Sequence, residues 1–392
     1  MPDVRKSNAI VAALTLLLMA PVQAQSPPAP AEAELAPVAL LVDLSSGQTL
    51  YARGASQRFL PASMTKAMTA LVAFDLIAAG QLDEARVITI SAPVAAGWAG
   101  QGTTLNLRAG QAVSIGDLLM GTTTVSANDA AVALAEAAGG STEHFVALMN
   151  ARAAALGMAD SHFAGPNGYP DGGRTYVSAA DLARLAAALV RDHPALYRRY
   201  FGHPAMAWRG AVLRSHDPFA AAGFPGADGI KTGHTAEAGY NFLGAVIRAG
   251  RRLVLVIGGA ASEGSRAAAA RALAEWGYGA WDSRALAPAG WIAGTARVQD
   301  GTRREVPLAL AQEARIALAR GSLAPGTSPV MSARIVYRGP LIAPVAKGAA
   351  VARLEITVRG GPPASLPLVA AAGADKAGPI DRIVNGLLGL LG

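Results

Sequence analysis

The sequence predicts an α/β (α+β) body with an antiparallel sheet and a helical cluster, followed by a small all-β domain. Strand-like segments at residues 38–52 and 229–258 enclose a series of helical segments, so the sheet is expected to draw strands from both ends of the body. Beyond about residue 286, short strand-like segments alternate with Gly/Pro turns. The 392 residues also exceed the usual size of a single domain. We place the two domains at residues 36–285 and 289–372.

The body begins with a predicted hairpin, in which strands at residues 38–43 and 49–52 flank a Ser/Gly turn. Ser126 and Asn128 are favourable capping residues for a helix at 128–138. The other expected elements of the body are helices at 61–79, 115–120, 142–156, 178–191 and 264–276, strands at 86–90, 229–232, 240–247 and 253–258, and short strands and loops at 97–110. The second domain is expected to contain strands at 295–298, 304–308, 314–318, 332–337, 350–358 and 365–369.

Residues 1–24 have the pattern of a secretory signal. Arg5 and Lys6 precede an apolar stretch at residues 9–19, and Val22-Gln23-Ala24 is a small-x-small cleavage site. An uncleaved anchor helix is the alternative, but the apolar stretch is short for a membrane span. Residues 25–35 are a Pro/Ala linker. The sequence therefore predicts an exported, periplasmic protein.

The C-terminal residues 379–392 carry apolar side chains at the spacing of one helical face. Such an amphipathic helix can lie in a membrane surface, and we expect it to attach the protein to the outer face of the inner membrane. Packing against the protein core is the alternative, since Gly386 and Gly389 weaken the helix. The apolar positions are Ile380, Ile383, Val384, Leu387, Leu388 and Leu391.

Composition excludes several classes of function. The formal charge is +7, but no basic run exceeds two residues, so no nucleic acid partner is expected. The absence of cysteine excludes thiolate catalysis and thiol metal sites. The histidines lack metal-ligand spacing, and neither a metal nor a cofactor is expected. Only five of the 34 basic residues are lysines, and a site that needs a neutral amine cannot use arginine.

Ser63 and Lys66 are the first candidates for chemistry. They lie one helical turn apart at the start of an apolar helical run, which places a hydroxyl and an amine on one face. Free backbone N–H groups at the start of a helix favour a developing negative charge. Together these are the parts of an activated serine nucleophile, although a single Ser-x-x-Lys is a weak signal.

Two further motifs strengthen the assignment. Ser126-Ala127-Asn128 precedes a predicted helix, and Lys231-Thr232-Gly233 begins a predicted strand. Ser-x-x-Lys, Ser-Asp-Asn and Lys-Thr-Gly are the signature set of penicillin-binding proteins and class A β-lactamases. Here the middle motif reads Ser-Ala-Asn, and the order of the set is kept.

The flanking residues narrow this resemblance. Residues 36–283 resemble the low-molecular-mass penicillin-binding proteins that act as D-alanyl-D-alanine carboxypeptidases, and the stretch from Asp228 to Thr235 is very characteristic of them. Residues 289–372 look like the family's C-terminal β domain, and 379–392 like its membrane anchor. The matching stretches of the body are residues 60–66, 68–70, 126–130, 156–158, 228–235 and 238–240.

The resemblance implies roles for the first two motifs. Ser63 would attack the carbonyl carbon between two D-alanines of a peptidoglycan stem peptide and form an acyl-enzyme. Lys66 would be the base, which requires a neutral amine and a depressed pKa. Ser126 would pass a proton to the leaving amine, and Asn128 would bind Lys66 or the substrate amide. β-Lactam antibiotics would be covalent inhibitors of the same serine.

The third motif would bind the substrate. Lys231 would supply positive potential for the terminal carboxylate, with Thr232 as a hydrogen-bond donor. The strand through Gly233 would pair with the substrate backbone. The family resemblance places the oxyanion hole at the backbone N–H groups of Ser63 and His234. The His234 side chain has either a packing role or a catalytic one.

The chain departs from the family before the third motif. The family usually has Asn-x-Asn there, often with a central arginine, whereas this chain has Arg214-Ser215-His216-Asp217. That arginine is therefore either lost or shifted to Arg214. A second family arginine is retained as Arg266, which either binds the substrate carboxylate as a bidentate partner or is an ordinary solvated helix residue.

Three other functions stay open at this point. A β-lactamase shares the fold and the acylation chemistry, but residues 164–169 contain no glutamate to activate the hydrolytic water. An endopeptidase that cleaves peptide cross-links is nearer, and the C-terminal domain favours the carboxypeptidase over it. A catalytically silent cell-wall scaffold protein is the non-enzymatic alternative, against which the three intact motifs argue.

Overall fold

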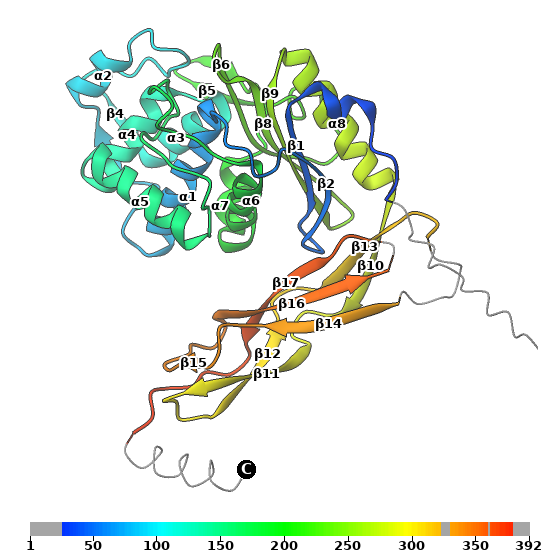
Figure 1. Cartoon of the computed structure of the whole chain (residues 1–392). Coiled ribbons are helices and arrows are strands. Elements are labelled where there is room, and N and C mark those ends of the chain that lie inside the picture. Colours follow the sequence, from blue (N-terminus) through cyan, green and yellow to red (C-terminus); the bar gives the residue numbers. More distant parts are fainter. Residues whose placement is uncertain (1–25, 323–329, 360, 379–392) are drawn as a thin grey trace, which may run out of the picture.

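The computed structural model describes residues 26–322, 330–359 and 361–378. The body contains a five-stranded antiparallel sheet in the order β2-β1-β9-β8-β7, with helices on both faces (Figure 1). β1 is bonded to β9 along its whole length, which confirms that the sheet is assembled from both ends of the body. Its strands are β1 (Val38–Asp43), β2 (Gln48–Arg53), β7 (Ala227–Thr235), β8 (Gly239–Arg248) and β9 (Arg251–Ala260).

The sheet separates two apolar cores because alternate side chains of a strand point to opposite faces. On β9, Val254 and Val256 pack against the helical cluster, while Leu253 and Leu255 face α8 (Glu263–Gly279). The N-terminal turn η1 (Ala31–Leu35) packs beside α8. Because both faces are covered, β8 and β9 are nearly continuous apolar runs.

The helical cluster is built around α1 (Lys66–Ala78), whose residues from Lys66 to Phe74 are all buried. A helix buried on every side needs no polar face, which explains why its sequence is mostly apolar. The surrounding helical elements are η2 (Ala62–Thr65), α2 (Ala92–Trp98), α3 (Ile115–Met120), η3 (Gly121–Val125), α4 (Asn128–Gly139), α5 (Thr142–Ala155), α6 (Ala179–Asp192) and α7 (Pro194–Tyr200). Two short hairpins complete the body: β3 (Val87–Thr89) with β4 (Ala112–Ser114), and β5 (Ala205–Trp208) with β6 (Ala211–Arg214).

The structure differs from the expected elements at several places, and residues 97–110, where short strands were expected, contain none. Helices α2 and α7 and the hairpin β5–β6 were not expected, because each is too short to show a clear period. The capping interpretation of Ser126 and Asn128 is wrong: the cap of α4 is Ala127, which makes no side-chain capping hydrogen bond. Ser126 instead ends the π-helical turn η3 in a left-handed conformation, with φ 71°.

The second domain is all-β, as predicted, with its own apolar core. A six-stranded sheet has the order β14-β16-β17-β12-β11-β15, and β10 pairs with β13 in a separate ribbon next to the body (Figure 1). The strands are β10 (Trp281–Ala287), β11 (Ile292–Gln299), β12 (Glu305–Leu310), β13 (Ala314–Ala319), β14 (Met331–Val336), β15 (Leu341–Ile342), β16 (Ala350–Val358) and β17 (Ala364–Ala370).

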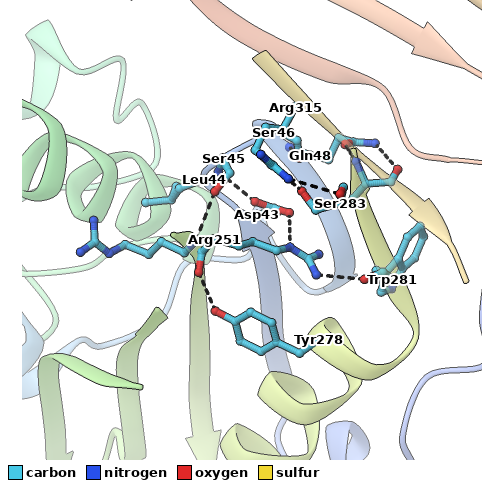
Figure 2. Close-up of polar contacts among 12 residues, drawn as sticks. Asp43, Leu44, Ser45, Ser46, Gln48, Arg251, Tyr278, Trp281, Ser283 and Arg315 are labelled. Atoms are coloured by element: carbon cyan, nitrogen blue, oxygen red, sulfur yellow. Dashed lines mark hydrogen bonds and ion pairs between the residues drawn. The ribbon is translucent and has the colours of Figure 1, made fainter. Parts of the chain in front are cut away.

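The tip of the β1–β2 hairpin joins the two domains. The amide of Gln48 donates to the carbonyl oxygens of Ala317 and Pro362, at 3.0 and 2.6 Å, and accepts from the Ala317 N–H. Figure 2 shows Gln48 near Asp43 and Arg251. Beside it, Arg251 forms a buried ion pair with Asp43 at 2.8 Å and donates to the carbonyl oxygen of Trp281. Buried polar groups that satisfy one another in this way fix one docking geometry.

The signal and anchor predictions, residues 1–24 and 379–392, lie outside the described residues. Among the helices of the described part, none has the length and apolar character of a membrane span.

Candidate active site

The turn that carries Ser63 is held between two other segments of the body. Ala62 has a left-handed φ of 48°, and η2 then leads directly into α1 at Lys66. A Cβ on Gly168 would lie 1.9 Å from the Ala62 carbonyl oxygen, and one on Gly233 would lie 2.2 Å from that of Pro61. Only glycine allows backbones to approach this closely. β7 and the segment after Phe163 therefore fix the position of the serine.

Lys66 lies beneath Ser63 with no exposed surface. Its Nζ is 2.9 Å from Ser63 Oγ, 2.7 Å from Asn128 Oδ1 and 2.7 Å from the backbone oxygen of Asn167. The two amide oxygens can only accept hydrogen bonds, so they take two N–H groups of the amine. In the neutral amine the remaining lone pair is then free to accept the Ser63 hydroxyl proton. This is the geometry of a nucleophile with its general base.

The charge state of Lys66 favours that role. Burial lowers its pKa well below the ordinary value, and the positive charge of Lys231 lowers it further, while Asp129 acts in the opposite direction. Removing a charged ammonium from water is costly, so a fully buried lysine tends to lose its proton.

The middle motif forms one wall of the site. Asn128 orients its amide by donating to the Gln101 carbonyl oxygen at 2.9 Å, which turns Oδ1 toward Lys66. The next residue, Asp129, accepts from the backbone N–H groups of Leu105 and Leu107 and so holds the adjacent loop. The Asn128 amide is therefore engaged with Lys66 and Gln101 and does not cap α4.

β7 forms the opposite wall. Lys231 is 3% exposed, and its Nζ donates to the Thr232 carbonyl oxygen at 3.0 Å. Burial and the nearby Arg266 lower the Lys231 pKa to about 7, although Asp217 opposes this. The His234 ring stacks on Tyr240 of β8, with ring centroids 4.0 Å apart. Lys231 adjoins the cavity through its neighbour Thr232, which lines it, and a positive charge there suits an anionic ligand.

The walls enclose a cavity of about 500 Å³. Arg266 borders it from α8 and is 3% exposed, with its Nη2 bonded to Glu263 at 2.8 Å. Burial lowers the pKa of Arg266 from its ordinary value. The lining residues are Ser63, Gly102, Thr103, Ser126, Asn128, Gly168, Tyr169, Pro170, His216, Thr232, Gly233, His234, Thr235, Tyr240, Glu263 and Arg266.

Most of the residues expected from the motifs thus meet at one place. Arg214 does not: it lies exposed at the end of β6 and is absent from the cavity lining, where His216 stands instead. The sequence analysis also missed Asn167 and Tyr169. The contact of Asn167 with Lys66 is made by a backbone oxygen, which no side-chain motif reveals.

The arrangement is suited to acyl transfer through a serine nucleophile. Within the described residues there is no group of three or more His, Asp or Glu side chains that could hold a metal ion. The site combines the hydroxyl of Ser63 with the buried amine of Lys66, and it places Lys231 next to the lining residue Thr232.

Comparison with known proteins also indicates a serine peptidase. The family model for D-alanyl-D-alanine carboxypeptidase matches residues 22–262, and the model for the C-terminal domain of penicillin-binding protein 5 matches residues 281–376. The D-alanyl-D-alanine carboxypeptidase DacD of Salmonella typhimurium is 31% identical, over 88% of this chain and 87% of the relative. DacA of Escherichia coli is 34% identical, over 61% of this chain and 60% of the relative.

Solved structures agree with the sequence matches. Penicillin-binding protein 5 from Haemophilus influenzae has a TM-score of 0.70 at 28% identity, covering 87% of this chain and 98% of that one. Penicillin-binding protein D2 from Listeria monocytogenes, solved in an ampicillin-bound form, has a TM-score of 0.54 at 28% identity and covers 62% of this chain and 97% of that one. The chain belongs to the D-alanyl-D-alanine carboxypeptidase family of serine peptidases.

Proposed function

We propose that this chain removes the terminal D-alanine from peptidoglycan pentapeptide stems through an acyl-enzyme at Ser63. The observation that carries the proposal is the 2.9 Å contact between Lys66 Nζ and Ser63 Oγ, in a buried site where two oxygen acceptors occupy the amine's N–H groups. Catalysis is assigned to residues 36–285, with residues 289–372 as a separate β domain.

In acylation, Lys66 takes the hydroxyl proton as Ser63 Oγ bonds to the carbonyl carbon of the penultimate D-alanine. The C–N bond to the terminal D-alanine then breaks, and Ser126 passes a proton to the leaving amine. Backbone N–H groups of Ser63 and His234 hold the developing oxyanion. Water then hydrolyses the ester and restores the Ser63 hydroxyl. β-Lactams acylate Ser63 in the same way.

The substrate carboxylate is bound at the β7 wall. Lys231 supplies positive potential, Thr232 donates a hydrogen bond, and Arg266 borders the same part of the cavity. The backbone of β7 through Gly233 offers an edge for pairing with the stem peptide, since β7 is the last strand of its sheet.

The protein is proposed to act in the periplasm, at the outer face of the inner membrane. The secretory pattern of residues 1–24 and the apolar stripe of residues 379–392 support this placement. Deleting residues 379–392 should release the protein from the membrane fraction of cells while its penicillin labelling persists. Unchanged membrane association would reject the anchor.

Two assays test the enzymatic proposal. A fluorescent penicillin should label the wild-type protein covalently, and Ser63→Ala should abolish the label; a scaffold protein would show none. Product analysis should then find free D-alanine from a pentapeptide. Cleavage of a cross-linked dimer without release of D-alanine would indicate an endopeptidase, and rapid loss of the penicillin label with hydrolysis of the drug would indicate a β-lactamase.

A further inference from the structure

His216 lies on the cavity wall where the substrate carboxylate is proposed to bind. It follows β6 and is held against α8, because the Nη2 of Arg266 donates to its backbone oxygen at 3.4 Å. It borders the same cavity as Thr232 and Arg266. None of the motifs includes it.

The charged groups around His216 come from three elements. Lys231 of β7 and the α8 residues Glu263 and Arg266 all act electrostatically on its ring. Asp217 follows it in the chain, is 6% exposed, and accepts hydrogen bonds from the backbone N–H groups of Phe219 and Ala220. The aromatic and imidazole side chains of the same cavity region are Tyr240 and His234.

The formal charges of this cluster cancel when the His216 ring is neutral. Below pH 7, where Lys231 is protonated, Lys231 and Arg266 carry two positive charges, and Asp217 and Glu263 carry two negative ones. His216 is exposed at the cavity wall, and the partial loss of solvent there together with the two cations lowers its pKa, so the free site favours the neutral ring near pH 7. A bound carboxylate would leave one negative charge uncompensated in a partly buried site, and an imidazolium is the group able to offset it.

We propose that His216 is a specificity-determining residue that gains a proton when the terminal carboxylate of the substrate enters the cavity. This inference rests on the proposed function of the same site. It makes recognition of a free C-terminal carboxylate stronger as pH falls.

The test compares kcat/KM for an acyl-D-Ala-D-Ala peptide with that for the same peptide ending in D-alaninamide, between pH 5 and 8. Lys231 titrates in the same range, so the comparison is made between wild type and His216→Gln. The preference for the carboxylate is the ratio of the two kcat/KM values. Near pH 6 we expect this ratio to be about tenfold lower in His216→Gln than in wild type, which corresponds to the loss of one charge-assisted hydrogen bond. His216→Arg should keep the preference and reduce its dependence on pH. His144→Gln, at an exposed position on α5, should match wild type.

An equal loss on both substrates, or an unchanged ratio in His216→Gln, would overturn the inference. Calorimetry of Ser63→Ala with the acyl-D-Ala-D-Ala peptide, in two buffers of different ionisation enthalpy, gives a second readout that needs no turnover. Near pH 6 it should show proton uptake that His216→Gln reduces and that the amide ligand does not produce. Absence of uptake with the carboxylate ligand would reject the role of His216. Failure of the wild-type protein to hydrolyse the peptide would instead reject the proposed function.

Discussion

The amine nitrogen of Lys66 lies 2.9 Å from the hydroxyl oxygen of Ser63, with no solvent access to the lysine. Asn128 and Asn167 each hold one oxygen 2.7 Å from the same nitrogen. The amine can therefore accept a proton only from the serine side. Burial and the charge of Lys231 lower the Lys66 pKa, which favours the neutral amine that this geometry requires.

Replacing Lys66 with arginine should abolish useful acylation. A guanidinium keeps its proton and cannot act as the base, so the rate of penicillin labelling should fall by about 10²–10⁴-fold. Stopped-flow labelling measures this directly. Lys347→Arg in the β domain, where the side chain is exposed, is the control and should label at the wild-type rate. Labelling of Lys66→Arg within tenfold of wild type would contradict the role of the amine.

Asn128→Asp should shift the pH profile of acylation. A carboxylate near Lys66 Nζ stabilises the ammonium and raises the Lys66 pKa by roughly 1–3 units. The rate depends on the neutral amine, so its rise with increasing pH should move to higher pH, and labelling at pH 7 should slow. The exposed Asn106→Asp adds the same charge elsewhere and should leave the profile unchanged. Coinciding profiles for Asn128→Asp and wild type would exclude electrostatic coupling at this contact.

Lys231 should limit substrate binding at alkaline pH. Its ammonium is present below its pKa of about 7 and is lost as pH rises through that value. KM for an acyl-D-Ala-D-Ala peptide should therefore increase above pH 7. Lys231→Arg keeps its charge and should move this increase to higher pH. A wild-type KM that is constant from pH 6 to 9 would show that the Lys231 charge does not bind the carboxylate.

Gly168→Ala should inactivate the site, while Gly172→Ala should not. Both glycines have positive φ, 70° and 74°, so both substitutions carry a similar backbone cost of about 1 kcal/mol. Only at Gly168 would the new Cβ meet a neighbour, the Ala62 carbonyl oxygen beside the nucleophile; at Gly172 nothing lies within 4 Å. Penicillin labelling of the two variants reports displacement of Ser63, and their thermal unfolding reports the backbone strain that both share. Equal labelling in both would refute the packing argument.

Gln48→Ala should weaken the joint between the domains. It leaves the buried oxygens of Ala317 and Pro362 and the Ala317 N–H without their side-chain partner, and each unsatisfied group costs about 1–3 kcal/mol. Denaturant unfolding should show a lower midpoint or an earlier separate transition of the β domain. Gln299→Ala, at an exposed position on β11, should leave unfolding unchanged. Identical unfolding curves for the two variants would contradict this account.

The sequence by itself determined the larger elements and the chemical groups of the site. Alternating and continuous apolar runs predicted β1 and the central strands, and β16 was placed with its observed bounds. Ser63, Lys66 and Asn128 were identified as residue types and spacings that serine acyl transfer needs, which are local properties of the chain. Arginine is far more common than lysine in this chain, so a lysine at position 66 indicates a need for an amine that can lose its proton.

Only the tertiary structure decided how those groups are used. The resemblance left Asn128 to bind either Lys66 or the substrate amide, and long-range packing turns its amide oxygen to Lys66. The oxygen of Asn167 belongs to the backbone and leaves no mark in the sequence. Arg214 and His216 are two residues apart and both exposed, but only His216 borders the cavity. Side-chain direction, burial and neighbouring charge depend on segments far apart in the chain, so spacing alone does not fix them.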